Sequence, residues 1–282
     1  MSNNHTLDQF ELKSFPQPAV ISLEYPVLLC HGYGAIASLF KPSPLHDACL
    51  LLREHGITAF APNVEPYARV EPRAQSWEKL IFDILDKTGS QKLNIIAHSM
   101  GGLDARYAIS TLELDSVIAS LTTLATPHHG TVLADLALKT PAPVKSRIGA
   151  FFDWLGDYIY PDTESDFLGP LEQLTPEYLE ETFNPENPDA ENVRYYSFGS
   201  AVGRGTDIPV SKLLTFQNRY IYESEGINDG FVSVQSAQWG QYIHSFELSH
   251  LEQMKMGIDE SRIPEWESCW LQMAKNLQQD GF

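Results

Sequence analysis

The chain has 282 residues, 43% of them apolar, which is enough for one large domain with a buried core. Its 37 acidic and 19 basic residues give a formal net charge of -18, which excludes electrostatic binding to nucleic acid and disfavours anionic lipid surfaces. We therefore expect a single domain, residues 1–282, in which any contact with lipid is made by apolar surface.

The amino-terminal residues 1–24 are polar with isolated apolar positions, and they lack a basic segment followed by an apolar core. They predict an irregular arm and no signal peptide. No apolar run is long enough to cross a bilayer. The three cysteines are scattered and odd in number, which argues against a disulfide framework and fits a reduced compartment. We therefore expect a cytoplasmic location, with export by a leaderless route as the alternative.

Short apolar runs then alternate with helical patterns. The predicted strands are residues 27–30, 57–60, 93–97 and 117–125. The predicted helices are residues 44–55, 76–87 and a segment from residue 103. This alternation predicts an α/β fold with a mostly parallel central sheet and helices on both faces.

Residues 131–189 interrupt this alternation and predict an inserted lid or cap. Seven aromatic and aliphatic side chains fall within ten residues of the segment 144–160. Their apolar face is expected to lie over a site or a lipid boundary, and a static buried helix is the alternative. Residues 182–192, rich in Asn and Pro, predict a surface loop.

The stretch from Leu93 to Tyr107 carries the strongest signal for chemistry. An apolar strand ends at Ala97-His-Ser-Met-Gly101 and a helix follows, so Ser99 lies at a sharp turn with small residues two positions to either side. Such a turn exposes the hydroxyl and lets the strand and the helix pass closely. Ser99 is the candidate nucleophile, and an ordinary strand-to-helix loop is the alternative.

Two later loops supply partners for this serine. After a strand at residues 194–198, Asn228-Asp229-Gly230 is a turn signal that we place at the end of a further strand, and His250 lies on a loop before a helix at residues 266–277. A serine hydroxyl needs an imidazole to take its proton, and the imidazole needs a carboxylate on its other nitrogen. We predict a triad of Ser99, His250 as base and Asp229 as acid.

Other residues compete for these roles. Asp207 is the second candidate for the acid, and a plain Asp-Gly turn is the alternative interpretation of Asp229. His244 is the nearest rival of His250, because only these two of the nine histidines follow the acid. The remaining candidates are expected to shape the pocket or to point away from the serine: His31, His98, His128 and His129.

The order Ser, Asp, His along the chain is typical of the α/β-hydrolase fold. In that fold the oxyanion of acyl transfer is held by two backbone N–H groups, one after the nucleophile and one on the loop after an early strand. We assign these donors to Met100 and to Tyr33, which follows the strand at residues 27–30.

Six motifs in the same order resemble the bacterial triacylglycerol lipases of the α/β-hydrolase fold, of the Pseudomonas, Burkholderia and Proteus type, over residues 25–275. These motifs are His31–Tyr33, Ala97–Tyr107, Ala125–Gly130, Tyr195–Ser200, Asn228–Ser233 and His250–Glu252. The resemblance implies hydrolysis of lipid esters and a mobile lid near residues 131–170. It also implies the triad Ser99, Asp229 and His250, with the oxyanion donors Tyr33 and Met100.

The same resemblance implies a structural calcium near the base, with Asp207 and Glu252 at the ligand positions. Calcium needs six to eight oxygens, so two carboxylates do not make a site, and the family has Asp where this chain has Glu252. The family's disulfide has no counterpart here, since Gln235 stands near the position of its second cysteine.

The sequence therefore predicts a serine carboxylic-ester hydrolase, a lipase or esterase that works through an acyl-enzyme and needs no cofactor for its chemistry. The expected partner is a lipid ester, with no nucleic acid. A thioesterase or acyltransferase with the same triad is one alternative, and a non-catalytic binding protein of the same fold is another.

Overall fold

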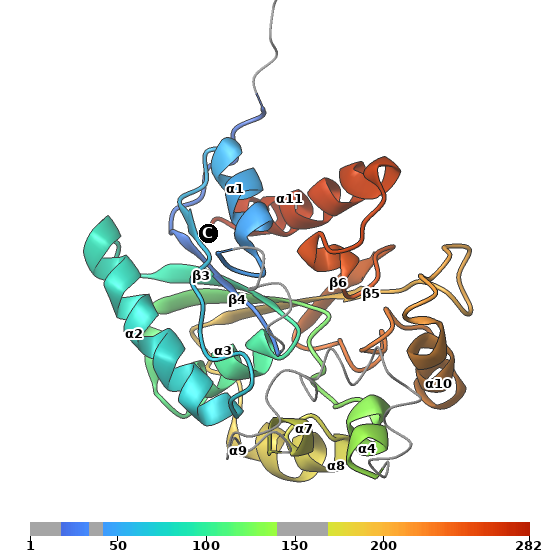
Figure 1. The fold of residues 1–282 in the computed structure, drawn as a ribbon. Helices are drawn as coiled ribbons and strands as arrows, with labels where there is room; N and C mark the ends of the chain where they lie inside the picture. Colours follow the sequence, from blue (N-terminus) through green and yellow to red (C-terminus); the bar gives the residue numbers. More distant parts are fainter. Residues whose placement is uncertain (1–17, 34–41, 140–168) are drawn as a thin grey trace, which may run out of the picture.

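The structure, a computed structural model, describes residues 18–33, 42–139 and 169–282. In the described part of the chain, a central sheet of six strands lies between two layers of helices (Figure 1). The strands are β1 (Val27–Cys30), β2 (Ala59–Phe60), β3 (Leu93–His98), β4 (Ile118–Leu124), β5 (Arg194–Ser200) and β6 (Gln241–Phe246). Their order is β2-β1-β3-β4-β5-β6, and every neighbouring pair is parallel. The predicted α/β class with a parallel sheet is confirmed.

The direction in which strands are added reverses between β1 and β3. From β1 the chain moves to the edge strand β2, then returns to β3 and proceeds to the opposite edge. In open α/β sheets, ligands bind at such a reversal, beyond the carboxyl ends of the strands. The residues that follow β1 and β3 are His31–Tyr33 and Ser99.

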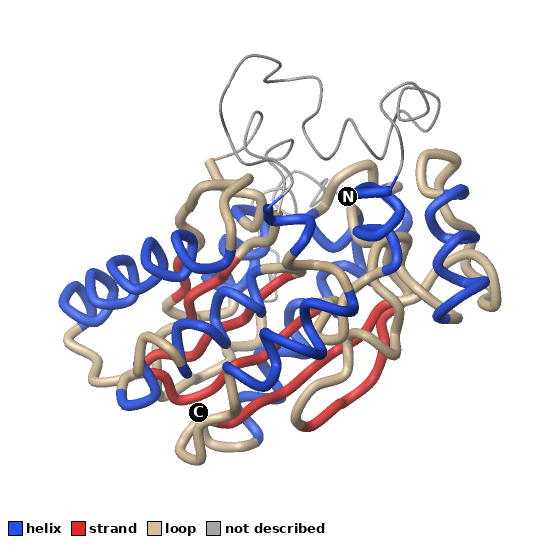
Figure 2. Tube along the Cα trace, turned by 90° about the horizontal axis from the view of Figure 1, so that it is seen from below, coloured by secondary structure: helices blue, strands red, loops and turns tan. Residues whose placement is uncertain are grey.

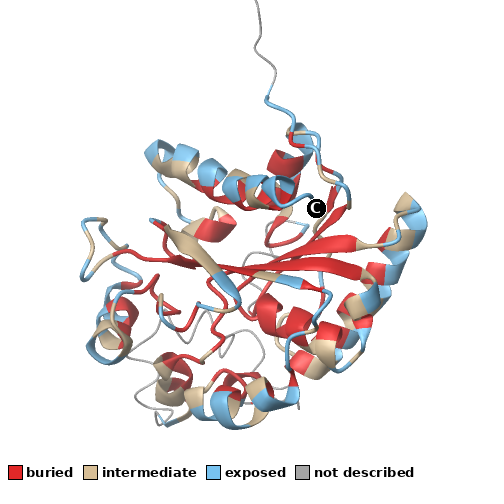
Figure 3. Ribbon diagram, turned by 180° about the vertical axis from the view of Figure 1, so that it is seen from behind, coloured by how far each residue is buried: buried red, intermediate tan, exposed pale blue. Residues whose placement is uncertain are grey.

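The central strands are buried on both faces, which explains their continuous apolar runs (Figure 3). Successive residues nonetheless point to opposite sides of the sheet. Leu29 and Ile96 join a core with α1 and α11, whereas Leu28 and Ile95 join a core with α2 and α3.

Helices cover both faces of the sheet (Figure 2). The α-helices in the described part are α1 (His46–Glu54), α2 (Val70–Thr88), α3 (Gly101–Ser110), α4 (Val132–Lys139), α7 (Gly169–Glu172), α8 (Pro176–Tyr178), α9 (Asn184–Glu186), α10 (Thr215–Glu225) and α11 (Ile263–Gln279). The single turns are η4 (Leu114–Ser116), η5 (Leu179–Phe183), η6 (Glu252–Met254) and η7 (Glu260–Arg262). Helices α1 and α11 pack together on one face, and α2 and α3 pack on the other (Figure 1).

Helix α2 begins at Val70, six residues before its predicted start. Pro72 falls in its first turn, where a missing N–H costs nothing because those donors have no intrahelical acceptor. Arg73 and Trp77, one turn apart, are both buried under the helix. The helix ends as predicted at Gly89, whose φ of 67° lies in the left-handed region.

Two predictions about local structure were wrong, the first of them in part. Of the surface loop expected at residues 182–192, residues 182–186 are helical, in the π-helical turn η5 and in α9, because Pro185 fits the first turn of a helix, and residues 187–192 form the loop. The strand expected before Asp229 is also absent. Helix α10 runs to Glu225, and Asn228 makes only isolated bridges to Val202 and Ser233.

The aromatic segment 144–160 lies outside the described residues, as does the central part of the predicted lid at 131–189. The flanking parts of that lid, α4 and α7 to η5, supply side chains to a third apolar core that also contains Tyr33, Met100 and Phe231. A lid that moves stays a prediction. Among the described residues, none of the helices combines the length and apolar character needed to cross a membrane.

Candidate active site

Ser99 lies in the tight turn that the sequence predicts between β3 and α3. Its φ of 57° is in the left-handed region, which is strained for a residue with a Cβ. Its N–H donates to the Leu124 carbonyl, and the Thr126 hydroxyl donates to the Ser99 carbonyl at 2.7 Å. A Cβ on Gly101 would lie 2.6 Å from the Cys30 carbonyl oxygen, so only glycine permits this close passage of the helix over the strand.

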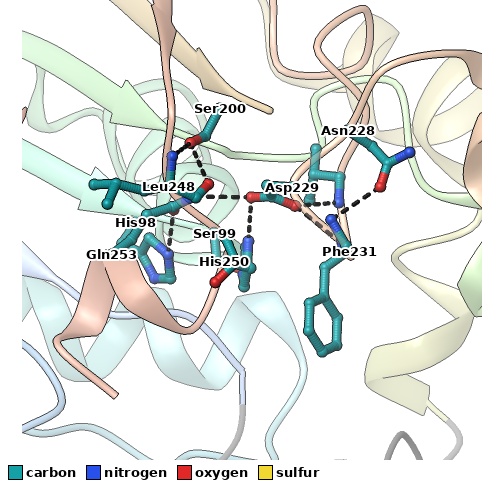
Figure 4. Close-up of polar contacts among 12 residues, drawn as sticks. His98, Ser99, Ser200, Asn228, Asp229, Phe231, Leu248, His250 and Gln253 are labelled. Atoms are coloured by element: carbon teal, nitrogen blue, oxygen red, sulfur yellow. Dashed lines mark hydrogen bonds and ion pairs between the residues drawn. The ribbon is translucent and has the colours of Figure 1, made fainter. Parts of the chain in front are cut away.

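The structure brings Ser99, His250 and Asp229 together, although 151 residues separate the serine from the histidine (Figure 4). His250 Nε2 lies 2.9 Å from Ser99 Oγ, and His250 Nδ1 lies 2.7 Å from Asp229 Oδ2. The imidazole and the carboxylate are 1% and 0% exposed. Water therefore competes little for these hydrogen bonds, and the imidazole bridges the hydroxyl and the carboxylate.

Asp229 is oriented by the main chain around it. Its Oδ1 accepts from the N–H groups of Phe231 and Val232 at 2.9 and 2.8 Å, which is the geometry of a carboxylate that closes its own turn. Gly230 has a φ of 100°, a conformation that favours glycine. The predicted Asp-Gly turn is therefore present, and its other carboxylate oxygen faces His250.

The loop that carries His250 is fixed to the same turn. The His250 N–H donates to the Asp229 carbonyl at 3.0 Å, so the base and the acid are joined by a backbone bond as well as by side chains. At the start of this loop, Ser200 at the end of β5 donates its hydroxyl to the Leu248 carbonyl at 2.5 Å (Figure 4). The base loop is thus anchored at both ends of the segment 248–250.

The two predicted oxyanion donors belong to segments that lie against Ser99. Met100 immediately precedes α3, so its N–H is one of those at a helix amino end without an intrahelical acceptor. A Cβ on Gly32 would lie 2.9 Å from both Met100 N and Ser99 Oγ, which places the loop before Tyr33 directly beside the elbow. The oxyanion roles of Tyr33 and Met100 stay predictions.

A buried ion pair that the sequence analysis missed holds this loop. Arg73 on α2 and Asp104 on α3 are both 0% exposed and 2.8 Å apart, and Trp77 Nε1 donates to the same carboxylate oxygen at 3.1 Å. Arg73 also donates to the His31 carbonyl at 2.7 Å. The guanidinium therefore connects α2 and α3, the helix that follows the nucleophile, with the predicted oxyanion loop.

His31 supports the same loop as a neutral ring. The Val64 N–H donates to its Nε2 at 3.2 Å, so the proton resides on Nδ1, which donates to the Gly32 carbonyl at 2.9 Å. Burial, with the nearby Arg73 as the second cause, lowers the pKa of His31 to about 3. His31 thus orients main chain and does not act as a base at neutral pH.

The four other histidines considered as rivals or pocket residues each bond to a group other than the serine. His98 pairs with Gln253, His128 contacts Thr123 and Arg106, His129 pairs with Glu180, and His244 bonds to the Ser245 carbonyl. Burial holds the pKa values of His98 and His128 well below the usual value. Asp207, the second candidate for the acid, is exposed, and the carboxylate bonded to His250 is that of Asp229.

The residues named for calcium do not fit a metal site in the described part of the chain. Glu252 Oε1 accepts from Arg262 Nε at 2.8 Å, and Oε2 accepts from the Ser249 N–H at 2.7 Å. Both oxygens are thus already engaged, one by a cation. The described residues contain no group of three or more candidate ligands, and Asp207 and Glu252 form none.

An apolar pocket opens on Ser99 and His250. Its remaining lining comes from the loop after β4, from α4, from the segment around α7, and from the two residues whose N–H groups bind Asp229. These residues are Pro127, Thr131, Leu133, Ala134, Leu171, Leu174, Phe231 and Val232. Apart from Thr131 and the two triad members, every lining side chain is apolar, so the pocket suits an uncharged hydrocarbon group.

Comparison with known proteins agrees with this geometry. The chain is 26% identical to the triacylglycerol lipase of Pseudomonas fragi over 93% of this chain and 99% of that protein. It is 28% identical to the triacylglycerol lipase of Burkholderia plantarii over 82% and 78% of the two chains. The crystal structure of the metagenomic carboxyl esterase MGS0156 superposes with a TM-score of 0.73 at 17% identity, covering 93% and 78%.

These relatives confirm the resemblance that the motifs indicate, and the structural neighbour shows the same fold. The family described as "alpha/beta hydrolase fold" matches residues 25–208, a range that contains both Ser99 and the predicted oxyanion loop. The chain belongs to the alpha/beta hydrolase fold family.

Proposed function

We propose that this protein is a serine carboxylic-ester hydrolase, a lipase or esterase that cleaves acylglycerols or other lipid esters through an acyl-enzyme. The observation that carries the proposal is the continuous hydrogen-bonded chain from Ser99 through His250 to Asp229, which opens on an apolar pocket. The similarity to triacylglycerol lipases of Pseudomonas fragi and Burkholderia plantarii supports the choice of ester.

In the first half of the reaction, Ser99 Oγ attacks the ester carbonyl carbon while His250 Nε2 accepts the hydroxyl proton. The carbonyl oxygen becomes an oxyanion between the backbone N–H groups of Met100 and Tyr33. When the tetrahedral intermediate collapses, the carbon–oxygen bond of the ester breaks and His250 returns its proton to the departing alcohol. The acyl group remains on Ser99.

In the second half, His250 takes a proton from a water molecule that attacks the acyl-enzyme, and it then protonates Ser99 Oγ as the carboxylic acid leaves. Asp229 accepts from His250 Nδ1 throughout, which keeps Nε2 free to receive a proton. It also stabilises the imidazolium formed in each half. No cofactor takes part in the chemistry we propose.

The pocket supports an apolar acyl group as the substrate part bound beside Ser99. Its leucine, alanine and valine side chains offer no partner for a charged or strongly polar group. A thioesterase or an acyltransferase would use the same three residues and differ in the leaving group or the acceptor. The rates on matched oxygen and thiol esters distinguish an esterase from a thioesterase. The share of acyl group transferred to an added alcohol, relative to water, distinguishes a hydrolase from an acyltransferase.

The proposal is tested with p-nitrophenyl esters of graded acyl length and with a fluorophosphonate that labels reactive serines. We expect hydrolysis of several of these esters and labelling at Ser99. Ser99→Ala removes the only group that forms the acyl-enzyme, so the rate should fall by about a millionfold in kcat and labelling should stop. Intact turnover by Ser99→Ala would overturn the proposal, and a wild-type chain without activity or labelling would favour a non-catalytic binding protein.

The lid expected over residues 131–189 has a separate test. If this region gates the pocket, activity on a short triacylglycerol should rise sharply as the ester passes its solubility limit. Smooth saturation through that limit would count against gating and would leave the assignment as an esterase intact.

A further inference from the structure

Gln253 is a buried amide whose side chain touches the acid of the triad from the side opposite the loop N–H groups. It is 0% exposed, and its Nε2 donates to Asp229 Oδ2 at 2.9 Å, the same oxygen that accepts from His250 (Figure 4). With the N–H groups of Phe231 and Val232 on Oδ1, the carboxylate therefore has donors on both oxygens. None of the donors other than His250 is ionisable.

The orientation of this amide follows from the chemistry of its neighbours. An ionised carboxylate only accepts hydrogen bonds, so the amide nitrogen of Gln253 must face Asp229. The amide oxygen then faces His98 Nε2 at 2.8 Å, and that nitrogen must carry the proton. Asp229 thus fixes the tautomer of His98 indirectly, through the amide of Gln253.

His98 is the residue directly before Ser99, so the series of hydrogen bonds from His250 through Asp229 and Gln253 leads back to the segment of the nucleophile. Its ring lies 4.6 Å from the ring of His250 between centroids, at 41°. Its buried Nδ1 has no hydrogen-bond partner among the described residues, which fits a ring that stays neutral beside a base that becomes charged. Burial, and secondly His250 itself, hold the pKa of His98 well below its usual value.

Gln253 is also fixed through its backbone. Its carbonyl accepts from Trp266 Nε1 at 3.0 Å and from Trp270 Nε1 at 3.1 Å, both on α11, and its N–H donates to the Ser249 carbonyl. The side chain consequently leaves a rigid turn, η6, three residues after His250. Its reach to His98 joins segments 155 residues apart in the chain.

We propose that Gln253 and His98 are positioning residues for the reaction. Gln253 holds the Asp229 carboxylate in line with His250, and His98 fixes Gln253 while tying the nucleophile strand to the base loop. This inference rests on the proposed function, because it assigns a role to residues that act through Asp229 and His250. Neither residue touches the substrate or transfers a proton.

The first test replaces Gln253 with leucine, which keeps the size and removes the donor. Because hydrogen bonds to charged groups are the strong ones, we expect kcat on a p-nitrophenyl ester to fall about tenfold or more, with KM within about twofold of the parent. The control is Gln217→Leu, the same change at a buried glutamine on α10, which should leave both constants unchanged. Gln253→Leu with the kcat of the parent would overturn the inference.

The second test asks whether His98 acts through its N–H. His98→Phe keeps a flat ring beside His250 and removes the donor, so it should lose activity to about the same extent as Gln253→Leu. His98→Gln places an amide N–H near the position of Nε2 and should restore kcat to within about threefold of the parent. A residue that only fills space would give the opposite order, with Phe tolerated better than Gln.

The third test uses pH, which a role in packing alone would not affect. The ionisable groups around Gln253 are Asp229, His250, His98 and, beyond it, His31. In Gln253→Glu, burial and the adjacent Asp229 carboxylate should raise the pKa of the new carboxyl group, which donates to Asp229 only when protonated. The kcat/KM of this variant relative to the parent should therefore fall as pH rises from about 6 to about 9. A ratio that does not change with pH counts against the role.

Thermal unfolding of every variant separates lost function from lost fold, and if Gln253→Leu does not fold, the His98 pair and the pH ratio decide. Failure of the inference is distinguishable from failure of the proposed function. If Ser99→Ala is inactive and Gln253→Leu behaves like the parent, only the positioning role fails. If Ser99→Ala remains active, the proposed function fails as a whole.

Discussion

The two sides of the site are held in different ways. The nucleophile side, which comprises residues 31–33 and 99–102, is fixed by the fully buried Arg73–Asp104 ion pair. The acid–base side, which comprises residues 228–232 and 249–253, is fixed by main-chain N–H groups and by the neutral amide of Gln253. The charged pair on this second side, Glu252–Arg262, is partly exposed, and neither of its members bonds to a triad residue in the described part of the chain.

This difference follows from what each side must do. The turn at Ser99 and the loop before Tyr33 keep one geometry throughout the reaction, so a permanent buried ion pair can hold them. In the proposed reaction, Asp229 must respond to a charge that appears and disappears on His250. A fixed cation beside Asp229 would compete with the imidazolium for the carboxylate, whereas neutral donors orient it without competing.

The largest effect is expected from Asp229→Asn, which tests the acid–base side. The amide oxygen can still accept from Phe231 and Val232, so its NH₂ group would face His250 Nδ1. The proton of the imidazole would then move to Nε2, which could no longer accept from Ser99. We expect kcat to fall by about 10⁴-fold with little change in thermal stability, and a loss below about tenfold would mean that Asp229 is not the acid.

The next effect concerns the nucleophile side. Arg73→Met removes the partner of a fully buried carboxylate, which should destabilise the fold by about 3–5 kcal/mol and lower kcat because the His31 carbonyl also loses its donor. Urea unfolding and ester hydrolysis measure the two losses. The double variant Arg73→Met/Asp104→Leu is the control, because it removes both charges and should recover part of the stability. A single variant as stable as the parent would contradict the distinction between the two sides.

Sequence patterns predicted most of the nucleophile side because its signals are local. The order strand, tight turn and helix around Ser99 lies within fifteen residues, and the parallel sheet follows from strands that alternate with helices. The Asp229 turn was also visible as Asn-Asp-Gly. The strand assigned before it was wrong because α10 and isolated bridges position that turn. One bridge joins Asn228 to Val202, which is distant in the sequence and leaves no local pattern.

The residues that orient the site could not be found in this way. Arg73 meets Asp104 across 31 positions, and Gln253 meets His98 across 155, so no spacing rule connects either pair. The available signal for Arg73 was its position one turn before Trp77 on the buried face of a helix, where an unpaired charge is not tolerated. For Gln253 there was only its position three residues after His250.

Two buried neutral histidines beside the nucleophile, His31 and His98, predict loss of stability in acid. His31 and His98 have lowered pKa values in the folded state, that of His31 at about 3, so the unfolded chain binds protons that the folded chain does not. The stability they contribute is present above about pH 6.5 and is lost as pH falls toward about 3 for His31. Each group can contribute up to about 1.4 kcal/mol per pH unit.

Urea unfolding at about pH 7 and about pH 5 measures this slope. His31→Gln in the predicted oxyanion loop and His98→Gln at the end of β3 each keep an amide in place of the ring and remove one titrating group. Each should therefore reduce the slope without abolishing it. Equal slopes for the parent and both variants would show that these rings are not the source of acid lability.

The smallest effect is expected at the Glu252–Arg262 pair, where the resemblance implied calcium. These side chains are 15% and 24% exposed, and a partly exposed pair contributes no more than about 1 kcal/mol. A bound calcium at a hundredfold excess over its Kd would instead stabilise the fold by about 2.7 kcal/mol. Because Arg262 already occupies one oxygen of Glu252 and the Ser249 N–H the other, we expect neither calcium nor a chelator to shift the melting temperature, and Glu252→Gln to lower it only slightly. A rise in melting temperature with calcium that disappears in Glu252→Gln would show that a metal holds the acid–base loop. Both sides of the site would then be held by a cation, and the contrast between them would fail.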